Sequence, residues 1–76
     1  MNVKVLGSGC RNCQTLEERV DTALDTLGKE ADVDHITDFG EIAAWGVMST
    51  PALVVDDEVV VSGRVPSVEE IAAFLA

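Results

Sequence analysis

The sequence predicts an α/β domain in which helices cover both faces of one mixed sheet. Short runs of β-branched residues alternate with segments whose apolar residues repeat at helical spacing. The order of these segments is strand, helix, strand, helix, strand, strand, helix. A strand, helix, strand unit crosses over to a parallel neighbour, whereas a hairpin adds antiparallel strands. The chain of 76 residues is below the usual size of one domain, so we expect residues 1–76 to form a single domain.

The first strand and the first helix are separated by a break rich in glycine. Residues 2–6 are typical of a short strand, and residues 7–9, with the sequence Gly-Ser-Gly, interrupt it. From Cys13 the apolar residues follow one helical face as far as Leu27, and Gly28 supplies the residue that ends a helix. We therefore expect an amphipathic helix that begins directly after the break.

The middle of the chain adds a second strand and a short helix. Residues 31–37 are typical of a strand, and residues 38–41 resemble a capping box that begins a helix through Trp45, which Gly46 ends. We expect Trp45 to fill the core rather than to contact substrate. A lone histidine in a strand is usually a surface residue or a residue with satisfied hydrogen bonds, so we assign no chemical role to His35.

The C-terminal part predicts a hairpin and a last helix. Pro51 opens residues 52–55, and the acidic residues 56–58 turn the chain into residues 59–61, in a register left open because the turn lacks glycine. Ser67 begins a capping box, followed by apolar residues at helical spacing. The order βαβαββα then predicts a four-stranded mixed sheet and three helices in an α/β/α sandwich. The first strand should lie between the second strand and the hairpin.

Composition and charge exclude several classes of partner. Apolar residues make up 47% of the chain, which is enough for a core. Fourteen acidic residues against five basic ones give a net charge of −9, which repels phosphate backbones and anionic lipids. We therefore expect neither nucleic-acid nor membrane binding; the charge serves solubility or reflects life at high salt. The sequence has no long apolar span and no secretory signal, which predicts a cytoplasmic location.

Cys10 and Cys13 carry the predicted chemistry. Two cysteines three positions apart in the first turn of a helix lie on one face, about 5–6 Å apart at Cβ and within reach of a disulfide. Unpaired backbone N–H groups, the helix dipole and Arg11 should stabilise a thiolate at Cys10, the predicted nucleophile. Cys13 heads the apolar face, so we expect it to be more shielded, with a higher thiol pKa, and to act as the resolving residue.

Other interpretations of the cysteine pair stay open. The two cysteines could simply be core residues. A closed zinc site needs four ligands, and the chain offers two thiols and the distant His35. Capture of Cu(I) needs only two thiolates, and copper carriers also place GxxCxxC early in a short chain. Those carriers end in a strand, however, whereas the capping box at Ser67 predicts a C-terminal helix. A redox-sensing interaction module is a further alternative.

Two segments together resemble a known family. One is residues 9–13, Gly-Cys-Arg-Asn-Cys, after a short strand, and the other is residues 45–53, Trp-Gly-Val-Met-Ser-Thr-Pro-Ala-Leu. They resemble the thioredoxin and glutaredoxin superfamily, and most closely its small redox-active disulphide proteins. The resemblance runs the length of the chain and implies a thioredoxin-like fold of the minimal glutaredoxin type. It also implies a cis bond before Pro51, close to the cysteines, and a backbone edge at Thr50 that pairs with substrate.

The resemblance implies an enzyme, a dithiol-disulfide oxidoreductase in electron transport and cell redox homeostasis. Cys10 would form a mixed disulfide with a substrate protein and Cys13 would resolve it. The redox-active disulfide would be the only cofactor, with no metal. Protein disulfides and an upstream reductase are the expected partners of a monomer; glutathione, the other candidate substrate, would rely on Arg11 and Arg64. The expected substrate-binding residues are Gly9, Arg11, Thr50 and Pro51.

The motif departs from thioredoxin in three respects. Gly9 replaces the tryptophan before the first cysteine, and the intervening pair is Arg11 and Asn12. The buried acid of thioredoxin has no match, because Lys4 is the only charged residue of the first strand. We expect Lys4 to be solvated or to snorkel rather than to act near the thiols.

Overall fold

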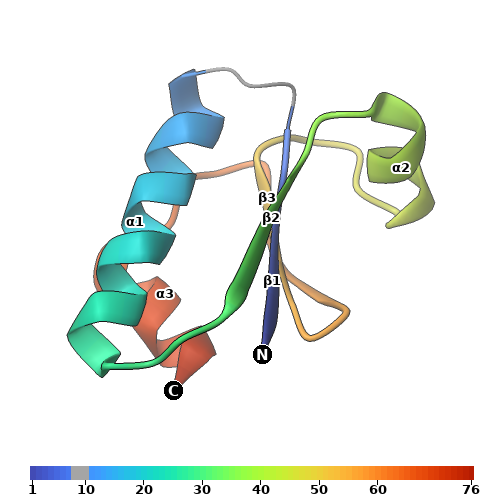
Figure 1. Ribbon diagram of the computed structural model, residues 1–76. Coiled ribbons are helices and arrows are strands. Elements are labelled where there is room, and N and C mark those ends of the chain that lie inside the picture. Colours follow the sequence, from blue (N-terminus) through green and yellow to red (C-terminus); the bar gives the residue numbers. More distant parts are fainter. Residues whose placement is uncertain (8–10) are drawn as a thin grey trace.

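The element order βαβαββα is confirmed in the computed structural model, which describes residues 1–7 and 11–76 (Figure 1). The sheet has four strands in the order β2-β1-β3-β4; β1 is parallel to β2 and antiparallel to β3, and β3 is antiparallel to β4. The predicted central position of the first strand is therefore confirmed. The elements are β1 (Asn2–Leu6), α1 (Arg11–Leu27), β2 (Asp32–Ile36), α2 (Phe39–Ala44), β3 (Ala52–Val55), β4 (Glu58–Ser62) and α3 (Val68–Leu75).

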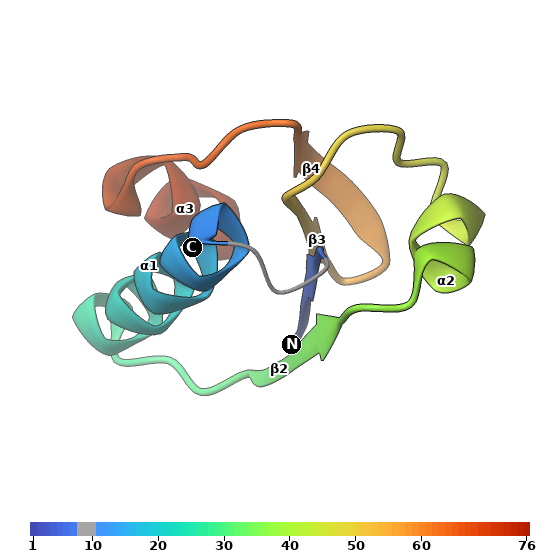
Figure 2. The ribbon, with the colours of Figure 1, turned by 90° about the horizontal axis from the view of Figure 1, so that it is seen from above.

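Helices cover both faces of the sheet, as predicted (Figure 2). Helices α1 and α3 lie side by side on one face, and α2 lies on the other. Each face has its own hydrophobic cluster. The cluster under α1 and α3 is the larger and contains Val3, Val5, Leu16, Val20, Ala23, Leu24, Leu53, Val55, Val61, Ile71 and Leu75. The cluster under α2 contains Leu6, Ile42, Val47, Ala52 and Val54.

The alternation of side chains along β1 decides which groups face which helices. Val3 and Val5 point into the cluster under α1 and α3, whereas Leu6 points into the cluster under α2. Lys4 lies two positions before Leu6, so its side chain points to the same face of the sheet. Its Nζ lies 5.4 Å from the centre of the Trp45 ring and 3.7 Å from Oδ1 of Asp57. Lys4 therefore snorkels along the α2 face with its amine over an aromatic ring.

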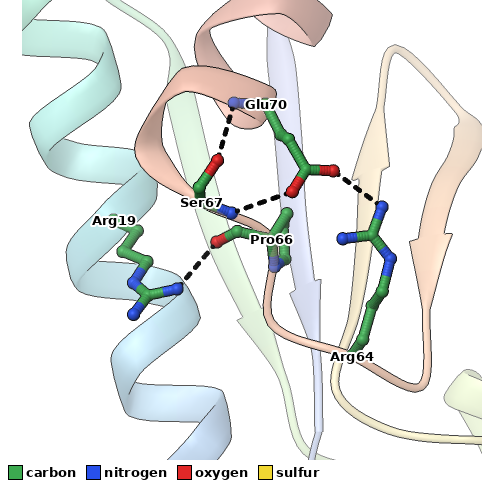
Figure 3. A network of polar contacts seen from close by, with 5 residues as sticks. All are labelled: Arg19, Arg64, Pro66, Ser67 and Glu70. Atoms are coloured by element: carbon green, nitrogen blue, oxygen red, sulfur yellow. Dashed lines mark hydrogen bonds and ion pairs between the residues drawn. The ribbon is translucent and has the colours of Figure 1, made fainter.

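Side-chain caps begin the two shorter helices. Asp38 is the N-cap of α2 and accepts a hydrogen bond from the backbone N–H of Gly40 at 3.1 Å. Ser67 is the N-cap of α3: its Oγ accepts from the N–H of Glu70 at 3.2 Å, and Oε1 of Glu70 accepts from the N–H of Ser67 at 3.4 Å (Figure 3). The predicted capping box at Ser67 is therefore confirmed, because both of its hydrogen bonds are present.

The hairpin turn uses two aspartates where glycine is usual. Asp56 and Asp57 have φ angles of 48° and 66°, the left-handed conformation that a tight hairpin turn requires and that aspartate tolerates better than most residues. The register pairs Val55 with Glu58 and shifts between Leu53 and Val54. This shift is a β-bulge, and it settles the register that the sequence left open.

The described helices are all short or amphipathic. None of those in residues 1–7 and 11–76 is both long and apolar enough to cross a membrane.

Candidate functional site

Cys13 is the half of the predicted dithiol that lies within the described residues. It is in the first turn of α1, and its exposed fraction is 0%. This burial agrees with the expected shielding, because the residue heads the apolar face that packs against the sheet. The predicted nucleophile Cys10 and its neighbour Gly9 lie outside the described residues.

Gly7 makes room for the sulfur of Cys13. A Cβ built on Gly7 would overlap Sγ of Cys13 and would lie 3.2 Å from Cβ of the same residue. The end of β1 can therefore approach the thiol only because position 7 has no side chain. The sequence reasoning treated Gly7 as part of a break between elements and missed this contact. The sequence does not distinguish a glycine that permits a turn after a strand from a glycine that makes room for a neighbouring sulfur atom.

Thr50 and Pro51 lie at the same end of the sheet. The bond between them is cis, as the resemblance to thioredoxins implied. Pro51 is buried while Thr50 is exposed, and the Cβ position of Gly7 lies 3.9 Å from Cβ of Thr50. The structure therefore brings together Gly7, the Cys13 sulfur and the loop at Thr50, three parts of the chain that are far apart in the sequence.

The loop after β4 packs along the proline loop. The N–H of Gly63 donates to the carbonyl oxygen of Pro51 at 2.9 Å. A Cβ on Gly63 would lie 3.0 Å from Cβ of Ser49, and its φ is +77°, so a glycine suits both the close approach and the backbone conformation. Met48, beside this loop, is 99% exposed. The Gly63 hydrogen bond thus supports the backbone of the loop whose Thr50 lies at the same end of the sheet as Gly7 and the buried thiol.

The two arginines considered for anion binding differ in their surroundings. Arg11 is the first residue of α1 and is exposed. Arg64 donates through Nη2 to Oε2 of Glu70 at 2.8 Å (Figure 3). This hydrogen bond raises the pKa of Arg64 and lowers the pKa of Glu70, which also accepts from the backbone of Ser67. A glutathione carboxylate would have to compete with Glu70 for the Arg64 guanidinium.

Arg19 connects helix α1 to the loop that precedes α3. Its Nη1 donates to the carbonyl oxygen of Pro66 at 3.0 Å (Figure 3). Pro66 is itself fully buried, and the next residue is the N-cap Ser67. The contact therefore fixes the start of α3 against α1, which carries Cys13.

His35 differs from the sequence-based expectation. Its Nδ1 lies 3.2 Å from Oε2 of Glu17, but its Nε2 is buried and has no hydrogen-bond partner. The expectation of a surface or fully satisfied histidine is therefore wrong for this second nitrogen. The sequence did not reveal the pair because Glu17 and His35 come from different elements, and their contact depends on how α1 packs over β2.

Carboxylate, thiol and imidazole groups do not converge on a metal site in the described part of the chain. Among residues 1–7 and 11–76, no group of three or more His, Cys, Asp or Glu side chains lies close enough together to hold a metal ion. His35 contacts Glu17 instead of completing a set of ligands. A closed site of four ligands would have to draw on groups beyond these residues.

Comparison with known proteins agrees with this geometry. The family model described as a thioredoxin domain matches residues 1–76. The chain belongs to the thioredoxin domain family. A protein named Thioredoxin from Methanocaldococcus jannaschii is 42% identical over 69 residues, which cover 91% of this chain and 79% of that protein. Another protein named Thioredoxin, from Methanothermobacter thermautotrophicus, is 38% identical over 76 residues, which cover 100% of this chain and 99% of that protein.

Proposed function

We propose that this protein is a cytoplasmic thiol-disulfide oxidoreductase that exchanges electrons between the Cys10 and Cys13 dithiol and the disulfides of other proteins. Membership of the thioredoxin family supports this type of activity. The observation that carries the proposal is the position of the Cys13 sulfur, which is buried against Gly7 at the end of the sheet that also holds the Thr50 and Pro51 loop.

The proposed reaction consists of two exchange steps. The Cys10 thiolate attacks one sulfur of a substrate disulfide, the substrate S–S bond breaks, and the other substrate sulfur leaves as a thiolate. Cys13 then loses its proton and attacks the Cys10 sulfur, which releases the second substrate thiolate and forms the Cys10–Cys13 disulfide. Two electrons have then passed to the substrate. An upstream reductase returns two electrons to this protein, and two protons restore the dithiol.

The positions of the two cysteines in the sequence relative to α1 support the division of roles. A nucleophile must meet a substrate, and position 10 precedes the first residue of α1, where N–H groups and the helix dipole favour an anion. Cys13 has an exposed fraction of 0%, so a protein substrate cannot reach it directly. A buried thiol can still attack a disulfide that its neighbour has already captured.

The loop at Thr50 would hold the substrate beside the cysteines. Thr50 is exposed and the buried Pro51 fixes its position, while Gly63 supports the loop through the 2.9 Å hydrogen bond to the Pro51 carbonyl oxygen. An extended substrate segment would pair with the backbone at Thr50, which is the mode of recognition known as strand addition. The exposed Arg11 lies in the turn that follows Cys10 and would contact a substrate that approaches that thiol.

Protein disulfides are favoured over glutathione as substrates. Glutathione is an anion, and the chain carries a net charge of −9. Arg64, one of the two arginines that could bind its carboxylates, is engaged with Glu70 at 2.8 Å. The same negative charge disfavours nucleic acid and anionic membranes as partners and supports a monomer, because two copies repel each other.

Insulin reduction tests the proposal directly. With dithiothreitol as electron donor, the wild type should accelerate the precipitation of reduced insulin B chain, and Cys10→Ser should abolish the acceleration. Cys13→Ser should retain a covalent mixed disulfide with the substrate, visible by mass spectrometry and removed by reductant. If Cys10→Ser accelerates the reaction as well as the wild type does, the assignment of Cys10 as the nucleophile is wrong.

A further inference from the structure

Nε2 of His35 is unusual in this structure. Within residues 1–7 and 11–76, it is the one buried side-chain nitrogen or oxygen that lacks a hydrogen-bond partner. Buried polar groups are nearly always paired, so an unpaired one calls for an explanation, and a role in proton transfer is one such explanation. The oxidoreductase mechanism proposed above assigns no role to this nitrogen.

Glu17 determines which nitrogen of His35 can accept a proton. Oε2 of Glu17 lies 3.2 Å from Nδ1 of the ring, and a carboxylate can only accept a hydrogen bond. A neutral ring that pairs with this carboxylate carries its proton on Nδ1, and Nε2 is then the basic nitrogen. Glu17 thus orients the imidazole, and the buried Nε2 is left as a hydrogen-bond acceptor without a partner.

Helix spacing and strand register place both members of the pair on the side of the sheet that holds Cys13. Glu17 follows Cys13 by four positions on α1, so the two side chains are neighbours on one face of the helix. His35 pairs with Val5 in the parallel register of β1 and β2. Gly7, which approaches the Cys13 sulfur, lies two positions after Val5, directly beyond the end of β1 at Leu6. Strand geometry places the Cα atoms of Gly7 and His35 about 8 Å apart, a separation that the imidazole and one water molecule can span.

We propose that His35, oriented by Glu17, accepts the proton that Cys13 loses when it resolves the mixed disulfide, an inference that rests on the proposed function. The Cys13 S–H bond breaks and its proton moves to Nε2 of His35, directly or through water. The thiolate attacks the Cys10 sulfur, the bond between Cys10 and the substrate breaks, and the substrate leaves as a thiolate. The proton on Nε2 then passes to that thiolate or to solvent, which returns the neutral ring.

Few other charged groups face this ring. The ionisable groups of α1 on this side are Glu17, Cys13 one turn before it, and the exposed Asp21 one turn after it. Strand β1 presents the apolar Val5 beside His35, since Lys4 points to the opposite face and contacts Trp45. Asp34, next to His35 in β2, also points to that opposite face by the alternation of the strand. A pH dependence removed by changing His35 would thus report on the pair with Glu17.

A reaction with the aromatic disulfide dithiobis(nitrobenzoate) separates the two thiols. The attack of Cys10 releases the first coloured thiolate in a step that depends on reagent concentration, and the attack of Cys13 releases the second in a step that does not. His35→Gln should slow the second step by about 100-fold near neutral pH, the lower end of what a general base contributes, and leave the first step unchanged. The pH profile of the second step should also differ between His35→Gln and the wild type.

Matched variants of α1 separate an effect on the proton from an effect on packing. Glu17→Gln should slow the second step by about tenfold, the lower end of the loss seen when the carboxylate partner of a metal-bound histidine is removed. Glu18→Gln removes a carboxylate from the next position, which is exposed and makes no contact with His35, and should react like the wild type. If circular dichroism shows that His35→Gln is unfolded, the test uses Glu17→Gln instead, because this residue lies on the helix surface.

The inference is wrong if folded His35→Gln or Glu17→Gln keeps the rate and the pH profile of the second step. An equal slowing of both steps also contradicts it, because that result indicates a structural role for His35. The reagent is a small molecule, so the outcome is separate from the proposed function. A wild type that completes both steps but does not reduce insulin would refute the proposed substrate class and leave the role of His35 measurable.

Discussion

The Cys13 sulfur occupies the space that a side chain on Gly7 would need. A Cβ at position 7 would overlap Sγ of Cys13, whose exposed fraction is 0%. The end of β1 and the start of α1 are thus in contact at the thiol itself. The glycine before the cysteine motif therefore belongs to the site, although it brings no functional group.

Replacing Gly7 by alanine tests this contact. Gly7→Ala forces the sulfur or the strand to move, so we expect a loss of unfolding free energy of about 1–3 kcal/mol, the usual cost of overpacking. Urea unfolding of the reduced protein measures the loss. The second, Cys13-dependent release from dithiobis(nitrobenzoate) should also slow.

Gly40→Ala is the matched control for Gly7→Ala. A Cβ on Gly40 would come no closer than 3.6 Å to its neighbours, and the residue lies in α2, where alanine is favoured over glycine. This control should be neutral or should stabilise the protein. Equal unfolding free energies for Gly7→Ala and the wild type would contradict the packing of the thiol described above.

The capping box of α3 contributes to stability. Ser67→Ala removes the Oγ that accepts from the N–H of Glu70 at 3.2 Å, so we expect a loss of about 1 kcal/mol in the free energy of urea unfolding. Thr26→Ala is a suitable comparison, because this exposed hydroxyl only donates back to the Thr22 carbonyl oxygen within α1. A loss at Ser67 no greater than that at Thr26 would argue against the cap.

The pair of Arg64 and Glu70 predicts a pH dependence of stability. The hydrogen bond from Arg64, followed by that from the Ser67 backbone, lowers the pKa of Glu70 in the folded protein. A lowered pKa means that the stabilisation is complete above the pKa of the unfolded chain, about 4.3 for glutamate, and is lost as the pH falls through the folded value. The difference in unfolding free energy between the wild type and Glu70→Gln should therefore be largest near neutral pH and should shrink in acid.

Glu69→Gln is the control for the pH experiment. Glu69 is the exposed neighbour of Glu70 in the first turn of α3, and the Arg64 guanidinium contacts Glu70 instead. Unfolding in urea at a series of pH values gives the comparison. A difference between wild type and Glu70→Gln that stays constant from neutral pH into acid would contradict the assigned role of this ion pair.

Local patterns in the sequence were sufficient for most of the fold. Apolar periodicity identified α1 and α3, and the sequence at Ser67 identified a capping box whose two hydrogen bonds are both present. These features depend on residues three or four positions apart. The hairpin register was open, because the turn at Asp56 and Asp57 adopts φ angles that glycine usually supplies and the bulge follows from pairing with β4.

Parts of the candidate site depend on contacts that no local pattern encodes. The cis bond before Pro51 was expected from the family resemblance alone, since most proline bonds are trans. The contact of Gly7 with Cys13 and the pair of His35 with Glu17 arise from the packing of α1 on the sheet. Lys4 lies on the α2 face, because the alternation of β1 turns it away from the face that holds Gly7.

The equilibrium between the dithiol and disulfide forms tests the central claim most directly. The purified protein is incubated in glutathione and dithiothreitol redox buffers, the fraction of free thiol is measured, and metal content is assayed on the same sample. We predict a metal-free protein whose Cys10 and Cys13 interconvert reversibly as a two-electron couple. Tight stoichiometric metal together with no reversible disulfide would contradict the oxidoreductase assignment and would support a metal carrier.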